Sequence, residues 1–600
     1  MNRKNWFALF VLSAVSIHAQ VENDIEQVMV HGKFIKTEYR NAIENIKVIS
    51  QDEIAKSPAQ SIDELLQQFT GMDIRRRGAQ GVQSDISLRG GSFEQVLILI
   101  NGIRMNDAQT GHNSLHIPVD LASVERIELI KGPAARRFGF SAYTGAINII
   151  TKTSAQEQAR IGVEVGDYKT YTMGLMSTFG SDKLQHLLQV NRGVSDGYRH
   201  NTDYQIQNVF YQNQYKINNG KLGFQAGFSE KEFGANGFYA SPKATEQYEE
   251  TQASIVGITY EQRLNNWDVN ANVYWRRGQD FYLYDRYKPE IYRNMHIGNN
   301  VGGEVNASYH SKLGITGLGV EVRKEFLESN NLGKRDRFGT QVFFEHHFSA
   351  LQNKLKISPG VSWAKYDIGG DYFYPGLDVG YQITTHHQFY GNIGKVHRIP
   401  SFTDLYYVSK TEEGNPNLQA EKALSAEVGY RYQRENFTFK TSVFTRNTDN
   451  AIDWIKETEN SVWKAQNITK VDTQGAEVEV EKAFPTFLNS RFNVSYTYLD
   501  TKLDMGNLIS KSVAENLRHQ FIAKADLELF KNFNQQISYR YLERVTTGSY
   551  HLLDAKWKYQ YRNFDWSLSI NNLTNTKYTE AFGVPMPGRW FHVGIGYTIR

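Results

Sequence analysis

The side chains that could carry acid–base chemistry in this chain are its 64 carboxylates and 16 histidines. No HExxH or Walker A motif is present, and no GxGxxG stands between a predicted strand and a predicted helix. Many carboxylates alternate with apolar residues, as in GAEVEVEKAF (475–484), which places them on the polar face of a strand. The absence of cysteine excludes thiolate nucleophiles, thiolate metal sites and disulfides. These features favour a binding or transport protein over an enzyme.

The N-terminus predicts export from the cytoplasm. Arg3 and Lys4 precede an apolar stretch (6–17), and Ala19 follows as a small residue suited to cleavage, so residues 1–19 are predicted to be a signal peptide. The rest of the chain contains no run of 18 uncharged apolar residues that could span a bilayer as a helix. A formal net charge of +3 gives no electrostatic support for a nucleic-acid partner.

The chain divides into two unlike regions, and the first is mixed in its secondary structure. A helix is predicted to begin at Ser61, with Glu64 completing a capping box and Gly71 ending it. Short strands are predicted around this helix, at 46–50, 85–90, 96–102 and 124–132. This pattern indicates a compact α+β unit over about residues 40–153.

After Thr153 the pattern becomes a long series of alternating segments. Examples are ARIGVEVGDY (159–168) and FHVGIGYTIR (591–600), in which one face is apolar and the other is polar or small. A closed sheet in a bilayer suits such strands, because their apolar faces contact lipid. Closure also leaves no sheet edge with unpaired backbone groups. The length of this region predicts an all-β transmembrane barrel of about 22 antiparallel strands. The last segment is expected to face lipid and to close the barrel against the first strand, near residue 160.

Several motifs in order resemble the TonB-dependent outer-membrane receptors. In the N-terminal region they are SIDELLQQFTGMDI (61–74), ISLRGG (86–91), VLILINGIR (96–104), VERIELIKGPAARRFG (124–139) and GAINIITK (145–152). In the barrel they are RIPSFTDLY (398–406), GNPNL (414–418), NNLTNTKY (571–578) and PMPGRWF (585–591). The plug sequence most resembles the cobalamin transporter branch of this family.

This resemblance implies a domain organisation and an activity. Residues 20–39 would hold a TonB box and linker, 40–153 a plug domain inside the lumen, and 154–600 the transmembrane barrel. The protein would lie in the cell outer membrane, in contact with its lipid, as a multi-pass barrel. It would import a scarce ligand actively, with energy delivered by TonB of the inner-membrane complex.

The TonB box is predicted in IEQVMVHG (25–32), close to the mature N-terminus. An extended segment can add as a strand to the edge of a partner's sheet, which makes backbone hydrogen bonds the main source of affinity. The predicted TonB-box residues are Ile25, Glu26, Gln27, Val28, Met29 and Val30.

The resemblance also implies charge pairs that hold the plug in the barrel. Arg89 and Lys131 lie on predicted plug strands, whereas Glu427 and Glu477 lie on the polar faces of predicted barrel strands. We refer to these four residues as the plug–barrel lock.

Ligand binding is expected at the apical loops of the plug, RGAQGVQSD (77–85) and MNDAQTGHNSLHIP (105–118). The candidate residues in these loops are five neutral amides and one imidazole: Gln80, Gln83, Asn106, Gln109, His112 and Asn113. Amides donate and accept hydrogen bonds, which suits a ligand rich in amides and phosphate edges, such as cobalamin or another corrinoid.

Other ligand classes stay open from the sequence. Arg75, Arg76 and Arg77, with the aromatic loop DFYLYDRYKPEIY (280–292), would suit an anionic ferric siderophore. Haem is less favoured, because no histidine stands between Phe402 and Gly414, where haem receptors of this family carry one. A passive porin is an alternative of a different class, although it would not need the N-terminal unit.

No resident cofactor or metal site is predicted. Calcium is possible but not predicted, because SDGYRHNTDY (195–204) offers only Asp196 and Asp203 as carboxylates. A monomer is expected, and a surface lipoprotein is a possible partner.

Overall fold

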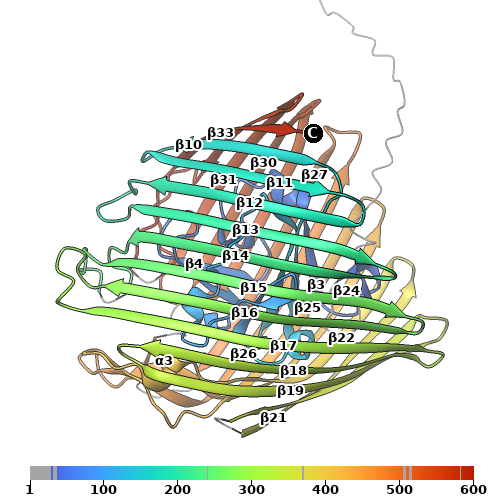
Figure 1. Cartoon of the computed structure of the whole chain (residues 1–600), viewed down its shortest axis with the longest axis horizontal. Helices are drawn as coiled ribbons and strands as arrows, with labels where there is room; N and C mark the ends of the chain where they lie inside the picture. Colours follow the sequence, from blue (N-terminus) through green and yellow to red (C-terminus); the bar gives the residue numbers. More distant parts are fainter. Residues whose placement is uncertain are drawn as a thin grey trace, which may run out of the picture.

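The computed structural model describes residues 29–30, 37–239, 241–367, 370–503, 508–511, 516–581 and 583–600 (Figure 1). The predicted signal peptide lies outside these residues, as do residues 25–28 of the predicted TonB box. The rest of that segment, β1 (Met29–Val30), pairs antiparallel with β2 (Thr37–Glu38).

The barrel consists of 22 long antiparallel strands in the described part of the chain, as the sequence predicts. They are β10 (Gln158–Gly166), β11 (Thr170–Gly180), β12 (Leu184–Ser195), β13 (Tyr204–Ile217), β14 (Gly220–Gly234), β15 (Tyr248–Leu264), β16 (Trp267–Leu283), β17 (Arg293–Ser311), β18 (Gly314–Ser329), β19 (Gly333–Ala350), β20 (Leu355–Tyr366), β21 (Gly370–Thr384), β22 (His387–Arg398), β24 (Glu421–Arg434), β25 (Phe437–Lys456), β26 (Trp463–Phe484), β27 (Ser490–Leu503), β29 (Leu517–Phe530), β30 (Phe533–Arg544), β31 (Gly548–Tyr561), β32 (Phe564–Asn571) and β33 (Trp590–Ile599). The short β23 (Glu412–Glu413) and β28 (Ile509–Ser510) lie in connections between them. The last strand pairs with the first, with Val163 opposite Ile595, so the predicted closure is confirmed.

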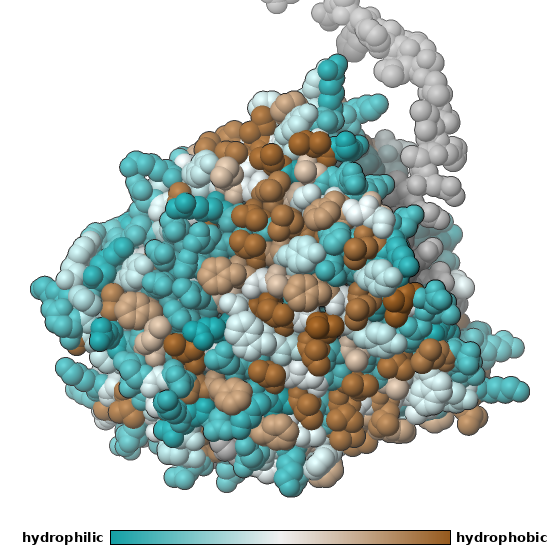
Figure 2. All heavy atoms as spheres, viewed as in Figure 1, coloured by the Kyte–Doolittle hydropathy of each residue, from teal (hydrophilic) through white to brown (hydrophobic). Residues whose placement is uncertain are grey.

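Alternation along the strands separates a lipid face from a lumen face. On β33 the exposed residues are Phe591, Val593, Ile595, Tyr597 and Ile599, whereas His592 between them is buried. Figure 2 shows the result as a broad band of hydrophobic side chains over the strands, next to a hydrophilic end. Lipid therefore covers the apolar side of the last strand, as expected.

The two ends of the barrel differ in their connections. One end carries the longer loops, among them 196–203, 235–247, 284–292, 399–420 and 572–589. At the other end the connections between strands span two to five residues, and the C-terminus lies there (Figure 1). We call the first end the long-loop end. The loop 399–420 contains the short helix α3 (Phe402–Tyr406).

The plug is a small α+β unit inside the barrel. Its five-stranded sheet has the order β3-β8-β9-β6-β7, and β4 pairs with β5 as a separate hairpin. The elements are β3 (Ile46–Ser50), α1 (Gln51–Lys56), α2 (Ile62–Leu66), β4 (Met72–Arg76), β5 (Ser84–Leu88), β6 (Val96–Ile100), β7 (Ile103–Arg104), β8 (Val124–Lys131) and β9 (Gly145–Thr151), with the 3-10 turns η2 (Tyr39–Asn41), η3 (Phe93–Gln95), η4 (Gly111–Asn113) and η5 (Gly132–Phe138). The plug core continues into the barrel wall, because Phe210, Ile255 and Tyr274 pack in the same hydrophobic cluster.

The predicted capping box at Ser61 is wrong. The Ser61 side chain makes no capping hydrogen bond, and α2 has only five residues. Glu64, which should complete the box, accepts hydrogen bonds from the Gln60 N–H and from Arg76 Nη1 instead. A complete capping box forms one element earlier, between Ser50 and Glu53 on α1. None of the helices in the described ranges is long and apolar enough to cross a bilayer.

Candidate functional site

The structure brings the four residues of the plug–barrel lock into one buried cluster. Arg89 Nη1 lies 2.9 Å from Glu427 Oε2, and Arg89 Nη2 lies 2.9 Å from Glu477 Oε2. Lys131 Nζ lies 3.2 Å from the same Glu477 oxygen. The Arg89 guanidinium also stacks 4.1 Å from the Phe444 ring centroid. Since all four charged side chains are almost completely buried, their charges are balanced by one another rather than by water.

Local backbone geometry allows this close approach. Arg89 has a φ of 51° in the tight turn that follows β5, and this turn directs its side chain to the wall. Gly71 and Gly132 flank the cluster. A Cβ on Gly71 would lie 2.2 Å from Glu477 Oε1, and a Cβ on Gly132 would lie 2.9 Å from Glu427 Oε2. Both glycines also have a positive φ, 76° and 68°, which glycine adopts without the strain that a Cβ would add. Burial lowers the pKa of Lys131, an effect that Glu477 opposes.

Further ion pairs between plug and wall were not predicted from the sequence. Arg–carboxylate pairs with separations of 2.6 to 3.0 Å join plug residues to barrel residues: Arg76–Glu580, Arg104–Glu321, Asp107–Arg276, Arg136–Asp378 and Asp73–Arg544. They attach the plug around the barrel rather than at one side. The available signal was the number of arginines in the plug motifs, but their partners lie hundreds of residues away.

The first apical loop reaches the long-loop end, and its amides are hydrogen bonded there. Gln80 Nε2 donates to His592 Nε2 at 3.1 Å, and the Tyr204 hydroxyl donates to Gln80 Oε1. Gln83 is buried between Arg77, which donates to its Oε1 at 2.8 Å, and Asp85. Gln80 therefore joins the loop to the wall, and Gln83 supports the loop from inside.

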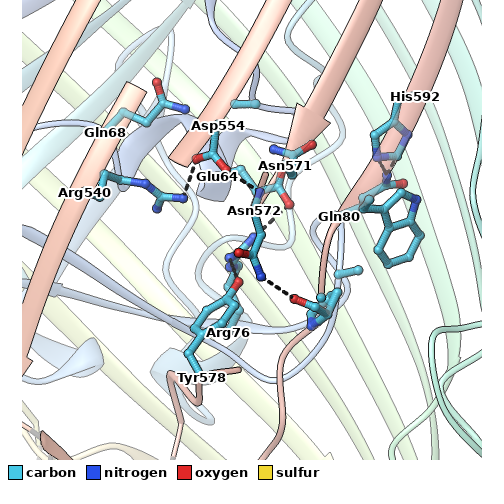
Figure 3. A pocket seen from close by; sticks show the side chains of 15 residues that line it. Glu64, Gln68, Arg76, Gln80, Arg540, Asp554, Asn571, Asn572, Tyr578 and His592 are labelled. Atoms are coloured by element: carbon cyan, nitrogen blue, oxygen red, sulfur yellow. Dashed lines mark hydrogen bonds and ion pairs between the residues drawn. The ribbon is translucent and has the colours of Figure 1, made fainter. Parts of the chain in front are cut away.

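Figure 3 shows the polar interface beside Gln80, between the plug and the last strands. Asp554 accepts hydrogen bonds from the Asn572 N–H and from Arg540, and the Asn572 amide donates to Thr576 O. These bonds hold the loop that begins with the NNLTNTKY motif. The same loop places Tyr578 and Glu580 beside Arg76. The cavity has a volume of about 40 Å³, which is room for a few water molecules. A ligand the size of a corrinoid does not fit this cavity.

The second apical loop contains both structural and available polar groups. Asn106 donates to Val96 O and accepts from the Ile98 N–H, both at 2.9 Å, so each end of its amide is bonded inside the plug. The side chain of Asn106 thus turns inward onto β6, and its contact with ligand stays a prediction. Gln109 is buried, and its Nε2 lies 3.4 Å from Asp280 Oδ2. Asn113 lies beside the same carboxylate and is half-buried.

His112 is held by a carboxylate from the first apical loop. Its Nδ1 lies 2.5 Å from Asp85 Oδ1, and Asp85 Oδ2 accepts from Arg77 at 2.6 Å. Burial opposes ionisation of Asp85, but Arg77 and His112 hold the pKa of this carboxyl well below its usual range. The two apical loops are thus joined through a buried charge.

Helix α3 covers part of the second apical loop. The Phe402 N–H donates to Ala108 O at 2.9 Å, and the Thr403 N–H donates to Gln109 O at 3.0 Å. Beneath this contact, Glu94 accepts from the Gly111 N–H at 2.7 Å. Burial and the nearby Asp404 raise the pKa of Glu94 to about 8. The RIPSFTDLY motif therefore forms a direct contact between an outer loop and the plug apex.

Other candidate residues are engaged elsewhere. Arg75 and Arg76 are buried in β4, and Arg76 is paired with Glu580 and Glu64. Asp196 pairs with Lys169, and Asp203 pairs with Arg286.

A GxSxG match at 193–197 also has a structural explanation. Ser195 ends β12, and its hydroxyl bonds to Tyr168 O and to Thr170 Oγ1. A hydrolase nucleophile of this pattern stands between a strand and a helix, whereas a loop follows here.

Comparison with known proteins agrees with this geometry. Residues 152–573 match the family model of the TonB-dependent receptor-like β-barrel, and residues 39–146 match that of the TonB-dependent receptor plug domain. The chain is 25% identical to the vitamin B12 transporter BtuB of Vibrio vulnificus, over 98% of each chain. It is 23% identical to BtuB of Vibrio cholerae, over 97% of each chain.

Solved structures share the fold. The siderophore receptor PirA from Pseudomonas aeruginosa superposes with a TM-score of 0.74 at 16% identity, covering 92% of this chain and 99% of that one. The FrpB iron transporter from Neisseria meningitidis superposes with a TM-score of 0.77 at 15% identity, covering 92% of this chain and 99% of that one.

The plug occupies the lumen and contacts the wall through its core and its ion pairs. The alternative of a passive porin is therefore wrong, and the related proteins are transporters and receptors rather than enzymes. The chain belongs to the TonB-dependent receptor family, whose members lie in the outer membrane and take up small ligands with the help of TonB.

Proposed function

We propose that this receptor imports cobalamin or another corrinoid across the outer membrane. The observation that carries the proposal is the similarity to vitamin B12 transporters along almost the whole of both chains. The apex supports it chemically, because the partly exposed Asn113 and His112 offer an amide and an imidazole there rather than a cluster of arginines. Each amide contact contributes only about 0.5–1.5 kcal/mol net, so tight binding requires several loops together.

A ferric siderophore is the second candidate. Its support is the loop 284–292, where Tyr287 is 72% and Ile291 is 55% exposed. The arginines that favoured an anionic ligand weigh less than the sequence suggested, because Arg76 and Arg77 are paired with plug and wall carboxylates.

Energy would reach the plug through the TonB box at 25–30. The pairing of Met29 and Val30 with residues 37–38 is consistent with a segment that can form a strand. The receptor is proposed to act as a monomer, and a surface lipoprotein could cover its long-loop end.

Titration of the purified receptor with cyanocobalamin tests the proposal. We expect sub-micromolar affinity that falls when Gln109 and Asn113 are both changed to Ala. Gln560→Ala is the matched control, because this exposed amide lies at the short-turn end. Saturable binding of a ferric siderophore without binding of any corrinoid would favour the second candidate.

A further inference from the structure

His112 differs from an ordinary loop histidine in how its ring is held. One edge is fixed by the 2.5 Å contact between Nδ1 and Asp85, and one face stacks on Phe93 with 4.0 Å between ring centroids. The side chain is nevertheless 34% exposed. The ring is therefore oriented by the plug and still partly exposed.

This contact decides which nitrogen is available. The ionised Asp85 carboxylate only accepts hydrogen bonds, so Nδ1 of a neutral His112 carries the proton and Nε2 keeps its lone pair. No residue in the described ranges forms a hydrogen bond with this Nε2. A carboxylate behind an imidazole is the arrangement that orients histidine toward a metal and raises its basicity.

Two other histidines, His116 in the same loop and His200 in the loop 196–203, are held differently at Nε2. His116 is buried, and its Nε2 lies 2.9 Å from the Ser229 hydroxyl. His200 is exposed, but its Nε2 lies 2.7 Å from Glu246 Oε1. Only His112 of these three combines a supporting carboxylate with an unengaged Nε2.

We propose that His112 coordinates the metal of the cargo, with Nε2 binding the cobalt of a corrinoid that has an exchangeable axial water. This inference rests on the proposed corrinoid function. In this ligand exchange, the His112 Nε2 lone pair forms a cobalt–nitrogen bond as the bond between cobalt and the oxygen of its axial water breaks. Water leaves with both protons, and cobalt keeps its oxidation state. Asn113 lies next in the chain, where its amide can contact the edge of the corrin ring.

Visible absorption of aquacyanocobinamide, titrated with the full-length receptor, tests the inference. We expect the cobalt absorption bands to shift on binding to the wild type, and His112→Gln to bind without this shift. Asp85→Asn should weaken cobinamide binding by about tenfold or more, because the supporting carboxylate is lost. His200→Gln should leave both the shift and the affinity unchanged. Trypsin resistance of each variant reports whether its plug is folded.

The outcomes separate this inference from the proposed function. Binding of cobinamide with unchanged bands, or a shift that persists in His112→Gln, overturns metal coordination while the import of corrinoids stands. If neither cobinamide nor cyanocobalamin binds, both proposals fail. Haemin also has an open axial position, and binding of haemin alone would overturn both proposals in favour of a haem ligand.

Discussion

At the scale of single residues, the plug–barrel lock makes a quantitative prediction. Glu427→Gln removes one of two carboxylates that balance Arg89 and Lys131, so Glu477 alone must neutralise two buried cations. Leaving a buried charge uncompensated costs about 3–5 kcal/mol. We expect faster trypsin cleavage of the plug in the purified variant and greater sensitivity of cells to large antibiotics.

Glu328→Gln provides the matched control. Glu328 lies 3.0 Å from Lys334, but the two side chains are 66% and 84% exposed. An exposed pair contributes about 0–1 kcal/mol, so cleavage and permeability should match the wild type. Wild-type behaviour of Glu427→Gln would show that Arg89 and Lys131 do not need this carboxylate.

At the scale of elements, the contact between α3 and the plug should depend on pH. Burial and Asp404 raise the pKa of Glu94 to about 8, while Arg398, Arg337 and the Gly111 N–H oppose this effect. A carboxyl whose pKa is raised in the folded contact stabilises that contact fully at a pH below its free-state pKa. This stabilisation decreases as the pH rises and is lost above the folded-state pKa of about 8. We expect the contact to be tighter at pH 6 than at pH 8.5.

Hydrogen exchange measures this contact directly, because the N–H groups of Phe402 and Thr403 donate to the plug loop. After correction for intrinsic rates, their protection should fall by up to about 75-fold between these pH values, the factor that a pKa of about 8 against a free value of 4.5 gives. Glu94→Gln stays neutral and should show nearly constant protection. Equal protection of the wild type at both pH values would refute the assignment.

The TonB box makes a second prediction at this scale. Met29→Pro removes a backbone donor and prevents strand addition. Ligand uptake should be abolished, while ligand binding at the cell surface stays normal. Met29→Ala keeps the N–H group and should take up ligand normally. Undiminished uptake by Met29→Pro would mean that energy enters through another segment.

At the scale of the whole molecule, periodicity was enough to predict the barrel. Alternation in 591–599 shows which side chains of the last strand face lipid. The pairing of this strand with the first one closes the sheet into a barrel. The family resemblance implied the pairing of Arg89 with Glu477, and strand alternation placed Glu477 on the lumen face, but Arg89 lies in the turn after β5 rather than on the predicted strand.

Features that depend on distant partners could not be predicted. Glu64 does not cap the helix because it pairs with Arg76 instead. Arg76 also pairs with Glu580, which lies on a loop near the C-terminus. Asn106 belongs to an apical loop in sequence, yet its amide turns inward to β6. The support of His112 by Asp85 joins two loops, and neither loop contains a signal for the other.

The most direct test of the corrinoid proposal is uptake of radiolabelled cyanocobalamin by the host strain with its own gene for this receptor deleted. Complementation with the wild-type receptor should restore saturable uptake, and deletion of TonB should remove it. Cells that display the receptor but take up a ferric siderophore and no cobalamin would contradict the proposal.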